Sequence, residues 1–113
     1  MSARSTAAAG RAHVAPVFAA LGDATRLALV SRLCAGGPLS IARLTTGTDV
    51  TRQAITKHLG VLARAGIVTD VRQGRERIWT LDPAHLAGAR GYLNEISIQW
   101  DRALDRLKKF VEE

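Results

Sequence analysis

Hydrogen-bonding side chains gather near the start of the segment 51–65: Arg52, Gln53, Thr56 and Lys57. On a helix, Gln53 and Lys57 would lie opposite an apolar stripe, while Arg52 and Thr56 would flank it in the first turns. Arginine pairs with guanine through two hydrogen bonds, glutamine pairs with adenine, and a threonine methyl contacts a thymine methyl. This pattern predicts contacts with base edges in a major groove. The neighbouring Thr51 and His58 are included in the expected DNA-contacting set.

A second basic group surrounds the glycine-containing turn at 73–75. Arg72 and Arg77 lie on either side of this turn, and Gln73 and Arg75 lie within it. Arginines near one turn can hold phosphates and enter a narrow minor groove. We therefore expect Gln73, Arg75 and Arg77 to contact DNA, and Trp79 to be a packing residue.

The bland alternative is that both groups are only solvated, charged surfaces. The distribution of charge argues against it. The net charge is +6, and residues 1–81 hold 11 of the 16 Lys and Arg but only 4 of the 10 acidic residues. A positive field concentrated in one part of a chain indicates a polyanionic partner.

The elements that position these residues follow from local signals. Thr51 suits the N-cap of a helix at 51–65, whose core stripe would be Ile55, Leu59 and Leu62. A short helix from Ser40 to Thr46 precedes it. The β-prone runs 67–72 and 77–81 form a hairpin, so that 67–81 would be a wing. The expected fold is mainly α with a small β-hairpin, a winged helix-turn-helix.

Two earlier helices would complete the domain at 13–113. One runs from Val14 to Leu21 with Pro16 in its first turn, and one runs from its cap Asp23 to about Ala35. The second should bury the following side chains: Leu27, Val30 and Leu33. Residues 1–12 are rich in Ala, Ser and Gly without periodicity, and we expect a tail there that is disordered or weakly helical.

The final helix, which begins at the cap Asp82 and Pro83, carries a heptad pattern of apolar residues. The pattern predicts a dimer interface along the last helix, which we expect the first helix to join. The residues expected in it are Val14, Val17, Phe18, Leu86, Ala89, Leu93, Ile96, Trp100, Ala103, Leu107 and Phe110, with Leu104 and Val111 widening the stripe. The alternative is that the stripe packs only on its own domain.

Residues 17–81 resemble the winged helix-turn-helix of the ArsR family of bacterial repressors. The resemblance rests on FAALGDATRLALV at 18–30, TRQAITKHLGVLARAGIV at 51–68 and GRERIWTL at 74–81. It implies a homodimer that binds an inverted-repeat operator in double-stranded DNA and represses transcription. It assigns the major-groove contacts to Arg52, Gln53, Thr56 and Lys57, and the wing tip to Gln73, Gly74 and Arg75.

The metal-ligand motifs of that family are missing. Where one family site has a pair of cysteines, this chain has Ser40 and Ala42. Along the last helix stand Asp82, His85 and Glu95, without the second histidine of another family site. We therefore expect no metal and no cofactor, and the chain resembles the subgroup that lacks these ligands. Nothing in the sequence identifies an effector.

Other classes of protein are weighed by what the sequence lacks. No arrangement of nucleophile, base or paired carboxylates stands out, so we expect no enzymatic activity. No apolar run approaches 18 residues and no signal-peptide core is present, so a cytoplasmic protein without a membrane partner is expected. The single cysteine, Cys34, is predicted to be a small apolar residue on a buried helix. A non-specific nucleic-acid-binding protein and a protein–protein adaptor on the same scaffold remain alternatives.

Overall fold

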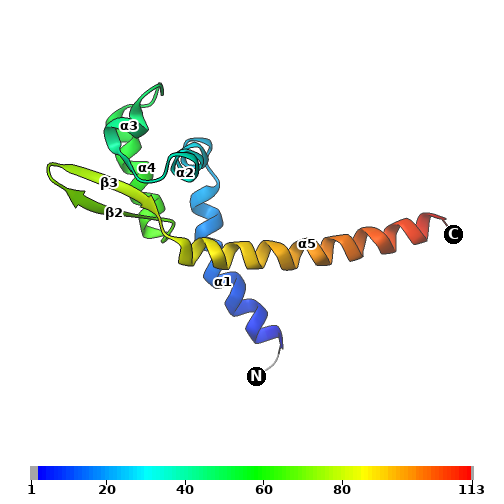
Figure 1. The fold of residues 1–113 in the computed structure, drawn as a ribbon. Coiled ribbons are helices and arrows are strands. Elements are labelled where there is room, and N and C mark those ends of the chain that lie inside the picture. Colours follow the sequence, from blue (N-terminus) through cyan, green and yellow to red (C-terminus); the bar gives the residue numbers. More distant parts are fainter. Residues whose placement is uncertain (1–2, 113) are drawn as a thin grey trace.

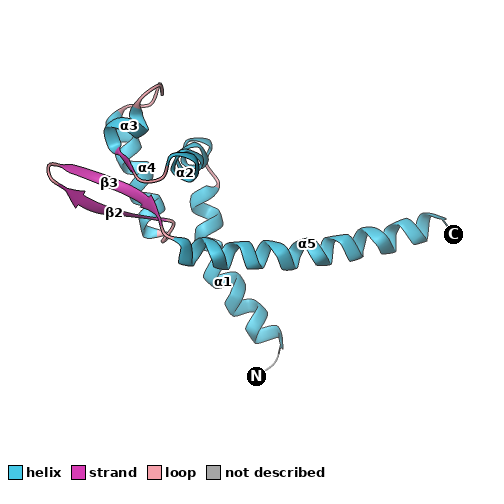
Figure 2. Ribbon diagram, viewed as in Figure 1, coloured by secondary structure: helices cyan, strands magenta, loops and turns pink. Residues whose placement is uncertain are grey.

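A computed structural model describes residues 3–112 of the chain. Five helices and three short strands follow one another in this order: α1 (Ala3–Leu21), α2 (Ala24–Gly36), β1 (Leu39–Ser40), α3 (Ile41–Thr45), α4 (Arg52–Arg64), β2 (Val68–Gln73), β3 (Glu76–Leu81) and α5 (Pro83–Glu112). Figure 1 shows α2, α3 and α4 gathered beside the β2–β3 hairpin, while α5 extends away from them. Figure 2 shows that the strands form a small part of a mainly helical fold. The expected winged helix-turn-helix is confirmed.

The helix N-caps are those predicted from the sequence. The side chains of Asp23, Ser40 and Thr51 accept hydrogen bonds from the backbone N–H three residues further on, at 3.0, 3.2 and 3.1 Å. Asp82 accepts from the N–H of Ala84 at 3.1 Å. Each cap satisfies a backbone donor that the first turn of a helix leaves unpaired. These bonds fix where α2, α3, α4 and α5 begin.

The first helix differs from the expectation. We expected residues 1–12 to be disordered or weakly helical and a separate helix from Val14, but α1 runs without a break from Ala3 and contains Pro16 in its interior. Met1 and Ser2 lie outside the described residues. The run of alanines explains the extension, since alanine has the highest helix propensity of all residues. Proline is tolerated within a helix only at the loss of one backbone hydrogen bond. The division of the chain into a tail and a domain stays a prediction.

The core lies between α2, α4 and the sheet. Ile55, Leu59 and Leu62 are fully buried along one face of α4, as their spacing predicted. On α2 the buried residues are Leu29 and Leu33, whereas Leu27 is 52 % exposed. The expectation for Leu27 was therefore wrong, because the face of α2 that packs against the core carries Leu29 and Leu33 and not Leu27.

The sheet has three strands rather than the two expected, in the order β1–β3–β2 with both pairs antiparallel. The additional strand, β1, pairs Leu39 with Trp79 and Ser40 with Ile78. It ties the start of α3 to the hairpin. Trp79 is buried in the core, as predicted. The hairpin turns through Gly74, whose φ of 64° lies in the left-handed region that favours glycine.

Helix α5 has two different halves. Its first turns pack against α1, where the rings of Phe18 and Tyr92 lie 6.1 Å apart between centroids. Val17 and Ala89 are buried in the chain's own core there, and Val14 is also buried. These three side chains are thus covered within one chain, although we expected them at an interface between two chains. From Leu93 onward every side chain that the structure describes on α5 is exposed.

Among residues 3–112 no single helix has both the length and the apolar composition needed to cross a membrane. The segments Arg11–Leu21 and Ala24–Gly36 meet these limits only when taken together, and they are bent by 97° relative to each other. Both contribute residues to the core described above.

Candidate nucleic-acid interface

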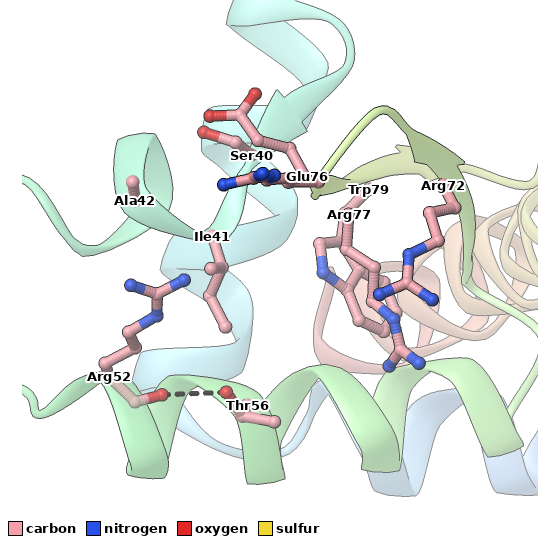
Figure 3. Close-up of a pocket in the computed structure, with 10 residues that line it drawn as sticks. Ser40, Ile41, Ala42, Arg52, Thr56, Arg72, Glu76, Arg77 and Trp79 are labelled. Atoms are coloured by element: carbon pink, nitrogen blue, oxygen red, sulfur yellow. Dashed lines mark hydrogen bonds between the residues drawn. The ribbon is translucent and has the colours of Figure 1, made fainter.

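A basic cleft opens between the start of α4 and the β2–β3 hairpin, which we call the wing. Its volume is about 370 Å³. The residues that line it come from α3, α4 and the wing: Ser40, Ile41, Ala42, Arg52, Thr56, Arg72, Arg75, Glu76, Arg77 and Trp79. Four of these are arginines and one is acidic. In Figure 3 the Arg52 side chain rises from α4 on one side, and those of Arg72 and Arg77 come from the wing on the other. The cleft is suited to hold anionic groups.

The N-terminal half of α4 presents a polar face to solvent. Arg52, Gln53, Thr56 and Lys57 are all exposed; Gln53 and Lys57 lie opposite the apolar stripe, and Arg52 and Thr56 flank it. The Thr56 hydroxyl donates to the carbonyl oxygen of Arg52 at 2.9 Å, which leaves its methyl group available for an apolar contact. The cap residue Thr51 is exposed as well, at the tip of the helix. The structure thus brings these predicted residues together on one surface.

The wing carries the other predicted residues at its outer end. Gln73 and Arg75 are exposed around the turn. Arg77 forms an ion pair with Asp70 across the two strands, at 3.2 Å between Nε and Oδ2. Exposed ion pairs of this kind contribute little free energy, about 0–1 kcal/mol, so DNA phosphate can compete for Arg77.

Arg72 also lines the cleft; we placed it in the basic group around the turn but not among the expected DNA contacts. It is the cross-strand partner of Arg77 in the register of the wing, so both side chains project on the same face. A hairpin register taken from the turn at Gly74 would have identified this pair. Ser40 and Ile41 were missed for another reason, since β1 alone brings them to the hairpin.

His58 does not lie on this surface. It is half-buried on the side of α4 that faces α2, where its Nδ1 lies 3.3 Å from Nη1 of Arg26 and 3.8 Å from Oδ2 of Asp23. The grouping of His58 with the DNA-contacting residues is therefore not supported by its position. A helical wheel places it at the edge of the polar face, and only the packing of α2 decides which way it points.

The residues considered for metal binding remain apart. Within residues 3–112 no group of three or more His, Cys, Asp or Glu side chains is placed to hold a metal ion. Ser40 instead caps α3, and Ala42 lines the cleft. Cys34 is exposed on α2, so the expectation that it is a buried apolar residue was wrong.

Arg75 allows a test of the wing. We expect Arg75→Ala to weaken DNA binding and to make it less sensitive to salt, because a phosphate contact releases counterions when it forms. The slope of log K against log salt should fall in magnitude by about 1 for each phosphate that the variant no longer neutralises. Fluorescence anisotropy at several salt concentrations measures this slope. An unchanged slope would mean that Arg75 does not contact the DNA backbone.

Comparisons with known proteins agree with this geometry. A family model described as a helix-turn-helix domain matches residues 21–71. The HTH-type transcriptional regulator Rv2034 of Mycobacterium tuberculosis is 40% identical over 93 residues, which cover 82% of this chain and 83% of that protein. The arsenical resistance operon repressor of Escherichia coli is 33% identical over 79 residues, with 70% of this chain and 68% of that protein covered.

A solved structure is similar over nearly the whole chain. It is an ArsR-like transcriptional regulator from Rhodococcus sp. RHA1, which superposes with a TM-score of 0.70 at 38% sequence identity. The superposition covers 88% of this chain and 92% of that one. The likeness therefore extends over most of both chains.

Proposed function

The chain belongs to the ArsR family of winged helix-turn-helix regulators and is a DNA-binding transcriptional regulator, and from this premise we propose that it acts as a homodimeric repressor at an inverted-repeat operator. The observation that carries the proposal is the basic cleft between the start of α4 and the wing. The first turns of α4 would read base edges in the major groove. The wing would contact phosphates and the adjacent minor groove.

Support for the dimer comes from the exposed apolar side chains of α5. Leu93, Ile96, Trp100, Leu107 and Phe110 are between 40 % and 77 % exposed. Together with Leu104 and Val111 we call them the apolar seam. Covering a side chain of this size contributes roughly 1.5–3 kcal/mol. A second copy of the chain, with α5 against α5 and Phe18 of α1 at the margin, would cover it.

The operator follows from the symmetry of such a dimer. Two copies of α4 related by a two-fold axis require two half-sites in inverted orientation. Their centres should lie about 10–10.5 base pairs apart, or a multiple of this. The contacts would be made by Thr51, Arg52, Gln53, Thr56, Lys57, Gln73, Arg75 and Arg77, to which the structure adds Arg72.

Other properties complete the proposal. The chain would act in the cytoplasm, without enzymatic activity and without a membrane partner. It would belong to the subgroup without the known metal-ligand motifs, since Ser40 and Ala42 stand at the positions of the cysteine pair. Release from DNA by a metal at that site is then not part of its function.

Binding to operator and random DNA tests the proposal. Footprinting on the DNA upstream of the protein's own gene would locate the operator, and titration against a random duplex of equal length would follow. We expect operator binding to be tighter by about 10³-fold or more at physiological salt. Equal affinities would indicate a non-specific nucleic-acid-binding protein, because the net charge of +6 would attract any nucleic acid. No binding to either duplex would favour a protein–protein adaptor.

A further inference from the structure

A polar cluster lies where α1, α2 and α4 meet, apart from the basic cleft. Its members are Asp23, Arg26 and His58. Asp23 and Arg26 stand at the start of α2, and His58 stands in the middle of α4. The side chains of Asp23 and His58 are 35 % and 24 % exposed. None of the three residues lines the basic cleft, and each is partly buried where the helices meet.

Arg26 joins three elements through one side chain. Its Nε donates to the carbonyl oxygen of Ala20, in the last turn of α1, at 2.5 Å. Its Nη1 lies 3.3 Å from Nδ1 of His58 on α4. Its backbone N–H donates to Asp23, the cap of α2, and this bond lowers the pKa of the Asp23 carboxyl below its ordinary value. A guanidinium is planar and rigid, so it holds these partners in a fixed relation.

The donor and acceptor at His58 follow from the chemistry of the groups. A guanidinium can only donate, so Nδ1 of His58 must accept. That requires a neutral imidazole with its proton on Nε2. Within the described residues, Arg26 and Asp23 are the charged side chains that lie within hydrogen-bond or ion-pair distance of this ring. A hydrogen bond donated by Arg26 would therefore select this tautomer and hold the orientation of the His58 ring.

The hydrogen bond between Arg26 and His58 lies close to the start of α4, so it can affect the position of the DNA-contacting side chains there. Arg52, the first residue of α4, lies six residues before His58, about 9 Å along the helix axis. A tilt of about 10° at His58 would move the start of α4 by about 1.5 Å. Binding sites lose function when their groups shift by about 1 Å. On the other side, Ala20 belongs to α1, which packs on α5.

We propose that His58 is a positioning residue which, by accepting a hydrogen bond from Arg26, fixes the tilt of α4 against α1 and thereby sets the half-site spacing that the dimer recognises. This inference rests on the proposed function, since spacing has meaning only for a dimer on an inverted repeat. In this proposal His58 does not contact bases but holds α4 in position. The side chain acts from behind the helix, through Arg26.

Two variants of His58 separate the acceptor from the bulk of the side chain. In His58→Asn the amide oxygen Oδ1 takes the place of Nδ1 and can accept from Arg26. In His58→Leu the apolar volume remains but no acceptor is present. Each full-length protein is titrated with operators whose half-site spacing is native, shortened by one base pair or lengthened by one. Circular dichroism and sedimentation report fold and dimer.

We expect the wild type and His58→Asn to bind the native spacing at least about tenfold more tightly than the altered ones. His58→Leu should bind the native spacing about tenfold more weakly, as expected when one hydrogen bond to a charged group is removed, and it should lose most of its discrimination between spacings. Full discrimination by a folded His58→Leu would overturn the proposal. So would a His58→Asn variant that behaves like His58→Leu.

A second measurement does not depend on DNA. Two-bond ¹H–¹⁵N spectra of the free wild-type protein report which ring nitrogen of His58 carries the proton. We expect a proton on Nε2 and an unprotonated Nδ1, with a change in the Nδ1 shift in Arg26→Lys. A proton on Nδ1 would overturn the inference even if His58→Leu proved unfolded. Failure of the wild type to bind any inverted repeat, with the expected tautomer present, would instead refute the proposed function and with it the link to spacing.

Discussion

Replacing Trp100 and Leu107 with aspartate should convert the protein into a monomer and lower its operator affinity by at least about 100-fold. Both side chains belong to the apolar seam and are 64 % and 57 % exposed in the single chain. Burying a carboxylate in such an interface carries a large desolvation penalty. A monomer could hold only one half-site and would lose the gain from binding two linked sites, typically 10²–10⁴-fold.

Ile98 provides a matched control for this prediction. It is an exposed apolar residue of the same helix, 52 % exposed, but at 100° per residue it lies about 160° from Trp100 around the axis. Ile98→Asp should leave both the dimer and operator binding close to wild type. Analytical ultracentrifugation at micromolar concentrations and a titration with operator measure the two properties. A double variant that remains a dimer would show that the two copies associate through another surface.

Arg52→Ala combined with Gln53→Ala should reduce specific operator affinity by about 10³-fold or more while leaving the dimer intact. One bidentate contact with a base contributes about 1–3 kcal/mol of discrimination, and the dimer would make each contact twice. Four contacts at the lower limit give about 4 kcal/mol, which corresponds to nearly three orders of magnitude. Binding to random DNA should change much less, since phosphate contacts from the wing remain.

A double alanine variant of the same two residue types on α5 provides the control for this prediction. Gln99→Ala with Arg102→Ala removes one amide and one guanidinium from an exposed surface far from the cleft. Its change in net charge equals that of Arg52→Ala with Gln53→Ala. This variant should retain operator binding. Quantitative gel shifts with operator and random duplex separate the two effects. Equal losses in both double variants would mean that charge, and not base contact, determines affinity, and unchanged binding in the first would place the DNA-contacting surface elsewhere.

The parts of the fold that the sequence predicted depend on local chemistry. A cap such as Thr51 or Ser40 forms its bond with a residue three positions away, so its signal is contained in a few neighbouring letters. The core stripe of α4 follows from the helical period alone. The polar residues at its start then fall opposite the stripe or beside it, and in the structure both Gln53 and Arg52 are exposed, as expected.

The parts that it did not predict depend on distant partners. Leu27 and His58 point away from their expected surroundings because neighbouring helices decide which face of α2 or α4 is covered. Strand β1 has only two residues, and it exists because Leu39 pairs with Trp79, which is 40 positions away. No local pattern carries that information. The same strand brings Ser40 into the cleft, so part of the candidate site was also beyond local reasoning.

The exposed half of α5 has a consequence for how such a regulator would respond to its own abundance. If the seam is completed only by a second copy, the species able to hold both half-sites forms in a second-order step. At low copy number most protomers would be single, and the amount of paired molecules would rise with the square of the amount synthesised. Operator occupancy would then increase more steeply than protein concentration. Below the concentration at which two copies pair, its target promoters would then stay open.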